Sequence, residues 1–112
     1  MDKQLQEEVA QIYANFCSGL ADTNRILILY ILSEDDFNVG EITERLNQPQ
    51  PTVSRHLKVL KERGIVEATR KGQSMVYSLC DHRVIDALNL LRAVIADRLN
   101  TQQSLVQNVQ AM

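Results

Sequence analysis

A chain of 112 residues with a net charge of −2 at pH 7 has room for one domain with a buried core. It has no apolar run near the ~18 residues of a membrane span and no apolar stretch after Met1 typical of a secretion signal. Its two cysteines, Cys17 and Cys80, lie far apart and suit a reducing compartment better than a disulfide framework. We therefore expect a cytoplasmic protein with no membrane partner.

The charge is distributed unevenly along the chain. Residues 1–44 hold nine acids and two cations, residues 45–83 hold eight cations and three acids, and the remainder is neutral. An anionic partner responds to local charge, so the middle segment, at +5, can face phosphate although the whole chain is acidic.

In chain order, the first expected element is a helix over about residues 3–18, because apolar residues recur there every three or four positions. Gly19 would loosen its end. Asp22 is expected to cap a second helix, which apolar residues nearly surround and which should be the central buried one. The polar run at residues 33–36 ends it.

Two short helices follow. Asn38 with Glu41 three residues later predicts a capping box and a helix that reaches Leu46. After a turn at residues 47–50, a second helix would begin near Pro51 and end before Gly64. Two short helices with a four-residue turn, at about residues 39–63, are typical of a helix-turn-helix.

The second of these helices has two different faces. Val53, Leu57 and Leu60 form an apolar stripe, and short hydroxyls and long cations cover the rest. Such a helix packs on one side and offers hydrogen bonds and positive charge on the other. Duplex DNA is the leading candidate for its partner.

The rest of the chain predicts a hairpin and a long helix. Residues 65–79 should form two strands joined by a basic turn, which is a wing when it follows a helix-turn-helix. Residues 81–100 should form an amphipathic helix, and residues 101–112 a polar tail. The apolar faces of the two terminal helices suggest a homodimer. The alternative is that both faces are used up inside the monomer.

The predicted fold is thus mainly α with a small β-hairpin: one winged helix-turn-helix domain over residues 1–100, dimerising through helices 3–18 and 81–100. Its order of elements resembles the ArsR/SmtB family of bacterial winged-helix repressors over residues 10–100. The runs that carry the resemblance are residues 19–29, 50–60, 64–66 and 76–79. The second run, Gln-Pro-Thr-Val-Ser-Arg-His-Leu-Lys-Val-Leu, is the most specific.

The resemblance implies a homodimeric, nucleoid-associated repressor that binds double-stranded operator DNA with an inverted repeat and leaves it when an inducer binds. By position, it implies that the recognition helix meets DNA through Gln50, Thr52, Ser54, Arg55, His56, Lys58 and Lys61. The first four would face the major groove, His56 would lie at the edge of that surface, and the lysines would neutralise phosphates. On the wing, Arg70, Lys71 and Gln73 would contact DNA.

Neither of two metal sites of the family is present here. The Cys-x-Cys site of the third helix is replaced by a segment without thiols, residues 38–42. The site on the last helix needs histidines where this chain has Arg83 and Val94, which cannot coordinate zinc. His82 alone is more often a surface histidine. We therefore expect no site of either kind, and the protein can be a family member without any metal ligand.

Cys17 and Cys80 are the only thiols, so they are the candidates for a thiol-based sensor. With a third ligand, the pair could hold arsenite or another soft metal ion, and a thiol oxidant could join them in a disulfide. The alternative is that Cys17 is a small buried hydrophobe and Cys80 has no function.

Two other function classes compete with a DNA-binding regulator. The acidic first third leaves open, as the alternative to DNA binding, a winged-helix module that binds protein. An enzyme is disfavoured, because the sequence has no nucleophile motif, phosphate-cradling glycine run, catalytic carboxylate pair or metal triad.

Overall fold

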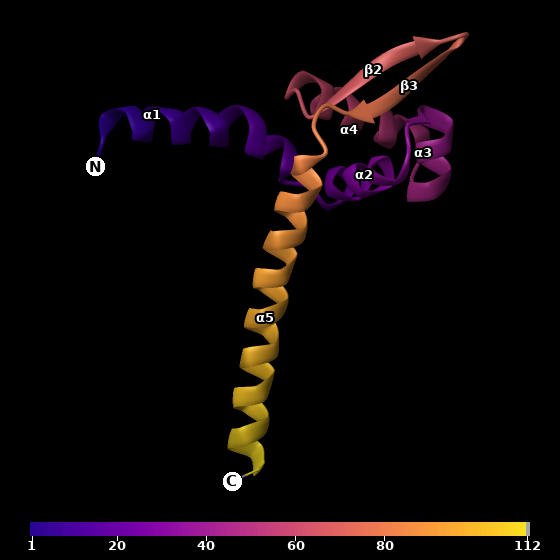
Figure 1. Cartoon of the computed structure of the whole chain (residues 1–112). Coiled ribbons are helices and arrows are strands. Elements are labelled where there is room, and N and C mark those ends of the chain that lie inside the picture. Colours follow the sequence, from indigo (N-terminus) through magenta and orange to yellow (C-terminus); the bar gives the residue numbers. More distant parts are fainter. Residues whose placement is uncertain (112) are drawn as a thin grey trace. The chain divides into compact units, whose positions relative to one another are not determined.

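The computed structural model describes the backbone of residues 1–111 and the side chains of residues 1–101. In chain order the elements are α1 (Lys3–Gln11), the π-helix η1 (Ile12–Phe16), the 3-10 helix η2 (Cys17–Leu20), α2 (Thr23–Glu34), β1 (Phe37–Asn38), α3 (Val39–Leu46), α4 (Gln50–Glu62), β2 (Val66–Lys71), β3 (Ser74–Leu79) and α5 (Arg83–Ala111). The fold is a winged helix-turn-helix (Figure 1). The chain divides into two compact units, Met1–Asp81 and His82–Met112.

The first helical segment changes its winding twice. Asp2 caps α1 by accepting from the backbone N–H of Gln4 at 3.1 Å, and the segment continues through η1 and η2 to Leu20. The sequence predicted a regular helix over residues 3–18. A wider π turn and a tighter 3-10 turn are set by hydrogen bonding that an apolar spacing does not specify. No side chain of α1 or η1 is buried.

Gly19, in η2, is buried and needed for close packing. A Cβ at this position would lie 2.8 Å from Cδ1 of Ile65 and 3.2 Å from Cγ of Arg63. The sequence suggested only that Gly19 loosens the helix end. The structure instead uses it to bring η2 against the start of the wing.

The core of the first unit lies among α2, α3, α4 and the sheet. Asp22 caps α2 as predicted, accepting from the backbone N–H groups of Asn24 at 2.8 Å and Arg25 at 3.3 Å. The fully buried apolar side chains are Ile28, Leu29, Leu32, Ile42, Val53, Leu57, Leu60, Ile65 and Val66. Leu27 is 45% exposed, so α2 is buried on one side rather than all round.

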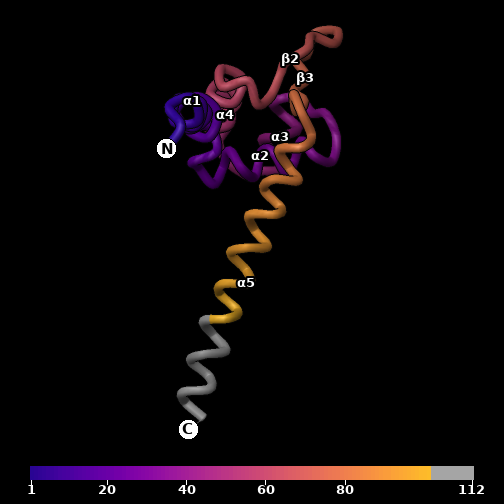
Figure 2. Tube along the Cα trace, turned by 60° about the vertical axis from the view of Figure 1, so that its left-hand side comes forward, coloured from indigo at the N-terminus to yellow at the C-terminus, as the bar shows by residue number. Residues whose placement is uncertain are grey.

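The sheet has three strands in the order β1-β3-β2, all antiparallel. The hairpin of β2 and β3 was predicted, whereas β1 was missed. Only two residues long, β1 pairs Phe37 with Tyr77 and Asn38 with Val76. In both views the hairpin extends away from α2, α3 and α4 (Figures 1 and 2). Gly72 has φ +63° at the first of its two turn residues, where a tight hairpin turn needs it.

Local capping fixes both ends of the helix-turn-helix. The predicted capping box is present: Glu41 N–H donates to Asn38 Oδ1 at 2.9 Å, and Asn38 N–H donates to Glu41 Oε1 at 3.0 Å. After α4, Gly64 adopts φ +75°, and Ile65 N–H donates back to the Leu60 carbonyl at 2.9 Å. This closure is a Schellman motif, and it sets the direction in which the wing leaves α4.

The second unit consists of α5. Leu88 is its one buried apolar side chain within the described residues, while Leu90, Leu91, Val94, Ile95 and Leu99 are 51–69% exposed. The sequence predicted that this helix ends near residue 100 and that a polar tail follows, whereas the backbone of α5 continues to Ala111. Of the side chains in that predicted tail, only Thr101 is described. None of the helices in the described part of the chain combines the length and hydrophobicity that a membrane span requires.

Candidate nucleic-acid interface

Helix α4 has one buried apolar face and one exposed polar face. Val53, Leu57 and Leu60 are completely buried, while the side chains on the other face are open to solvent. The exposed residues of the predicted contact set are Gln50, Ser54, Arg55, Lys58 and Lys61. Thr52 is half-buried and stands at the margin of this face. One rigid helix therefore presents amide, hydroxyl, guanidinium and ammonium groups together.

The cations of this face are available to a ligand. Within residues 1–101, no carboxylate forms an ion pair with Arg55, Lys58 or Lys61. An unpaired surface cation can exchange its counterions for a phosphate without first breaking an internal bond. The same face can therefore bind an anionic backbone.

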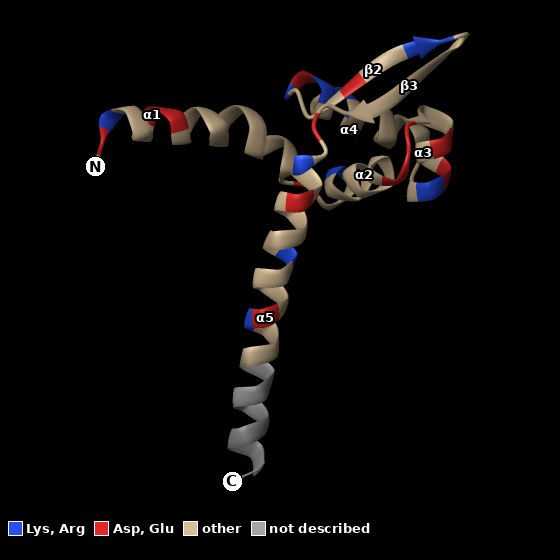
Figure 3. Ribbon diagram, in the orientation of Figure 1, with Lys and Arg blue, Asp and Glu red and all other residues tan. Residues whose placement is uncertain are grey.

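A second group of polar residues lies at the wing. Arg70 pairs with Met75 and Lys71 with Ser74 in the last two rungs of the hairpin, and Gln73 lies in the turn. All three predicted wing residues are exposed. Figure 3 shows the cations on β2 near the tip of the hairpin, away from α2, α3 and α4. Projecting cations of this kind suit contact with phosphate or a minor groove.

His56 departs from the prediction. It is only 6% exposed and is the one buried polar or charged residue among those described. We expected it at the edge of the DNA-facing surface, and its burial corrects that placement. Residue 56 follows Val53 by three and precedes Leu60 by four, so it belongs to the apolar stripe. This spacing could have revealed its position from the sequence.

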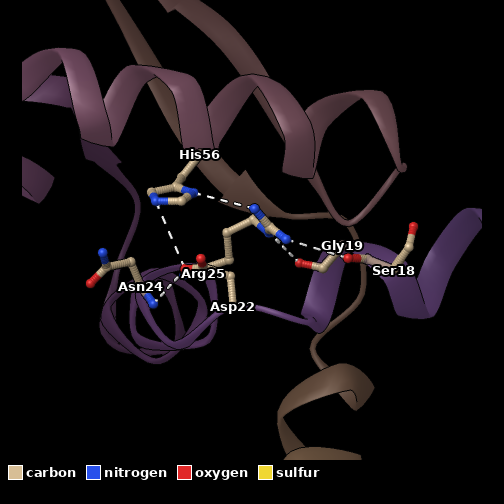
Figure 4. Close-up of polar contacts among 6 residues, drawn as sticks. All are labelled: Ser18, Gly19, Asp22, Asn24, Arg25 and His56. Atoms are coloured by element: carbon tan, nitrogen blue, oxygen red, sulfur yellow. Dashed lines mark hydrogen bonds and ion pairs between the residues drawn. The ribbon is translucent and has the colours of Figure 1, made fainter.

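The His56 ring faces the start of α2. Its Nε2 lies 3.8 Å from Asp22 Oδ1, and its Nδ1 lies 3.4 Å from Nη1 of Arg25 (Figure 4). Arg25 also donates from Nε to the Gly19 carbonyl at 2.7 Å and from Nη2 to the Ser18 carbonyl at 3.4 Å. The sequence predicted no partner for Arg25. No local pattern signals a contact between residues 31 positions apart.

Asp22 remains a carboxylate in this setting. Burial raises the pKa of its carboxyl, but the backbone N–H groups of Arg25 and Asn24 donate to it. Together with nearby positive charge, they bring its pKa below the usual value. Asp22 therefore caps α2 with full charge at neutral pH.

The two cysteines are both free thiols. Cys17 is half-buried in η2, and Cys80 is exposed just after β3. Burial and the neighbouring Glu67 carboxylate raise the pKa of the Cys80 thiol. Reactive cysteines usually have a lowered pKa, so this surrounding does not activate Cys80. Among the described residues, no three His, Cys, Asp or Glu side chains form a group that could hold a metal ion.

The comparisons with known proteins agree with this geometry. The model for the bacterial regulatory proteins of the arsR family matches residues 22–68, from the cap of α2 into β2. The HTH-type transcriptional regulator MJ1325 of Methanocaldococcus jannaschii is 37% identical over 86 residues, which cover 76% of this chain and 92% of that protein.

The chain belongs to the ArsR family.

Two further relatives match the chain beyond the helix-turn-helix. The biofilm growth-associated repressor of Xylella fastidiosa is 32% identical over 94 residues, covering 84% of this chain and 82% of that protein. The homodimeric winged helix-turn-helix DNA-binding domain Mb0332 of Mycobacterium bovis superposes with a TM-score of 0.74 at 26% identity, covering 88% of this chain and 91% of that one. MJ1325 is named a transcriptional regulator, the Xylella protein is named a repressor, and the matching family is one of regulatory proteins, as expected for a protein that is not an enzyme.

Proposed function

We propose that this ArsR-family protein is a homodimeric repressor that binds duplex operator DNA with an inverted repeat and releases it when an inducer binds. The observation that carries the proposal is α4, which buries its apolar face and leaves unpaired cations and hydroxyls on the other. The proposed base contacts are Gln50, Thr52, Ser54 and Arg55, and the proposed phosphate contacts are Lys58 and Lys61. Arg70, Lys71 and Gln73 would hold the DNA at the wing. His56 is left out because its side chain is buried.

Repression and dimerisation are supported by the relatives, since one is named a repressor and another is a homodimeric DNA-binding domain. They are also supported by the exposed stripes on both terminal helices. On α1 and η1, Leu5, Val9, Ile12 and Phe16 are 37–56% exposed, and α5 carries the exposed residues described above. Apolar surface of this extent is usually covered by a partner. We propose that a second copy covers it.

The dimer is tested by placing a charge within the stripe. Ile95→Glu should give a monomer in sedimentation, because a carboxylate would be desolvated at the interface. Ala93 is exposed and lies on the opposite side of α5. Ala93→Glu is therefore the matched control and should leave the dimer intact. A dimer that survives Ile95→Glu would reject this interface.

DNA binding is tested with a duplex that the protein itself selects from a random-sequence library. In a gel shift, Arg55→Ala combined with Lys58→Ala should weaken binding to this duplex by at least about tenfold, since each lost contact costs on the order of 1 kcal/mol or more. Lys3→Ala changes a cation on α1, opposite the apolar stripe, and should have no effect. If no duplex is selected, or if the double substitution binds normally, a protein-binding module becomes the better description.

For the inducer, we propose a thiol-directed species: arsenite, another soft metal ion or a thiol oxidant. The support is that Cys17 and Cys80 are the only thiols of the chain and both are free. Release from the selected duplex is screened against arsenite, zinc, nickel, peroxide and persulfide. Cys17→Ser and Cys80→Ser should each abolish release by the active compound. Release that persists in both variants would end the thiol proposal.

A further inference from the structure

The recognition helix is joined to the N-terminal helical segment at two places. One is the Arg25 guanidinium, which contacts the Ser18 and Gly19 carbonyls of η2 and the His56 ring of α4 (Figure 4). The other is Gly19 itself, which packs against Arg63 and Ile65 at the end of α4. Helix η2 is therefore linked through Arg25 to the middle of the helix proposed to read DNA, and it packs directly against the end of that helix through Gly19.

The contact between Arg25 and His56 has a definite direction. A guanidinium can only donate hydrogen bonds, so Arg25 bonds to the tautomer of His56 in which Nδ1 is the acceptor. The ring proton then lies on Nε2, which faces Asp22 Oδ1 at 3.8 Å. Asp22 in turn caps α2 through its bonds to the backbone. Both ring nitrogens thus face a polar partner held by another element.

Core packing alone does not require a histidine here. An apolar side chain of similar size would fill the place beside Val53, Leu57 and Leu60 without needing any partner. A buried histidine adds orientation instead, because its hydrogen bonds exist only when α4 is rotated to one angle about its axis. Arg55, the next residue back along α4, lies about 100° around the helix axis from His56 and is exposed. Any rotation that breaks the His56 contact also moves Arg55.

We infer that Arg25 and His56 are positioning residues, which fix the recognition helix α4 to the end of the N-terminal helical segment and thereby set how accurately α4 discriminates between DNA sequences. The inference rests on the proposed function. Neither residue touches DNA, and both act through Arg55 and its neighbours on the exposed face. The Arg25–His56 contact also links the orientation of α4 to η2. Helix η2 directly continues α1 and η1, which are proposed to form part of the dimer interface.

The test compares binding to the selected duplex with binding to a scrambled duplex of the same composition. The first variant, His56→Leu, removes both polar contacts of the ring but still fills its place in the core. The second, Arg25→Lys, keeps the positive charge but loses the planar guanidinium that donates to several acceptors at once. Each should reduce the ratio of the two affinities by about tenfold or more, which is the usual effect of one poorly read base pair. Affinity for the scrambled duplex and the salt slope should stay unchanged, because the α4 cations remain.

Further variants separate positioning from loss of fold. His56→Asn places an amide oxygen near the position of Nδ1, so it should keep the Arg25 contact and most of the discrimination. Combining Arg25→Lys with His56→Leu should cost no more than the larger single effect, because both remove the same contact. Far-UV circular dichroism gives the folded fraction of each variant. Arg25 is only half-buried, so Arg25→Lys should fold even if His56→Leu does not. In that case Arg25→Lys and His56→Asn still test whether the Arg25–His56 contact positions α4.

Three results would overturn the inference: an unchanged affinity ratio, an equal loss on both duplexes, or additive effects of the two substitutions. Arg55→Ala is measured in parallel. If Arg55→Ala loses discrimination while the Arg25 and His56 variants do not, the positioning role fails and the proposed function stands. If the wild-type protein selects no duplex, the proposed function itself fails.

Discussion

Replacement of Gly19 by alanine gives a sharp test of the packing between η2 and the start of the wing. The new methyl carbon would lie 2.8 Å from Cδ1 of Ile65 and 3.2 Å from Cγ of Arg63. Ile65 is only 2% exposed, so its terminal methyl group has little space to move. Overpacking of this kind costs about 1–3 kcal/mol. Alanine also lowers the conformational entropy of the unfolded chain, which stabilises the folded state by about 0.4–1 kcal/mol.

The net expectation for Gly19→Ala is a loss of about 1–2 kcal/mol in the free energy of unfolding. For a chain of this size, that corresponds to a fall in Tm of about 4–16 °C. The measurement is thermal and urea unfolding at one fixed protomer concentration, because association changes the apparent stability of a dimer. Gly40→Ala is the matched control. The Cβ added there meets only Asn38 Oδ1, at an ordinary 3.4 Å, so the variant should be neutral or slightly more stable.

A second substitution identifies the atom responsible. Ile65→Val removes the Cδ1 atom that the added methyl group would approach. By itself it should cost about 0.5–1.5 kcal/mol. In this background Gly19→Ala should cost clearly less than it does in the wild type. A Gly19→Ala variant as stable as the wild type, or a cost that Ile65→Val does not reduce, would refute the close approach of η2 to the wing.

Lys58→Ala should reduce the slope of log affinity against log salt by about one unit, whereas Lys3→Ala should leave this slope unchanged. Gel shifts over a salt series measure the slopes. If Lys58→Ala and the wild type have equal slopes, Lys58 does not contact a phosphate. Because the folded-state pKa of Asp22 is lowered, its carboxylate contributes stability above the unfolded pKa near 4, and this contribution is lost as pH falls through the folded pKa. Asp22→Asn should therefore flatten the loss of stability during acid unfolding below about pH 4; parallel acid-unfolding curves would contradict this. Alkylation of Cys80 should be slow at pH 7 and accelerate toward pH 10, since burial and Glu67 raise the pKa of its thiol; rapid reaction at pH 7 would argue against it.

Local signals in the sequence predicted most of the helix-turn-helix. The Asn38–Glu41 capping box, the Asp22 cap and the left-handed Gly64 each depend on neighbouring residues, so they could be read directly from the chain. The apolar stripe of α4 followed from its spacing. For the same reason, the exposed cations of α4 could be placed on the opposite face before the structure was known.

Features that depend on distant parts of the chain were missed. Strand β1 is two residues long and exists only because Phe37 and Asn38 meet β3, about 40 positions later. The pairing of Arg25 with His56 and the contact of Gly19 with Ile65 are tertiary in the same sense. His56 is a different case, since its place on the stripe was visible in the spacing. Its polar character obscured its burial.

The π turn at Ile12–Phe16 has a consequence for how the length of this protein can vary. A π turn holds one more residue than the α turn it replaces, so its hydrogen bonds run from each residue to the fifth one before it. Loss of a single residue there can convert the turn to α without displacing the Asp2 cap at one end or the Gly19 contact at the other. We therefore expect a single-residue deletion at this turn to be tolerated better than one within α1.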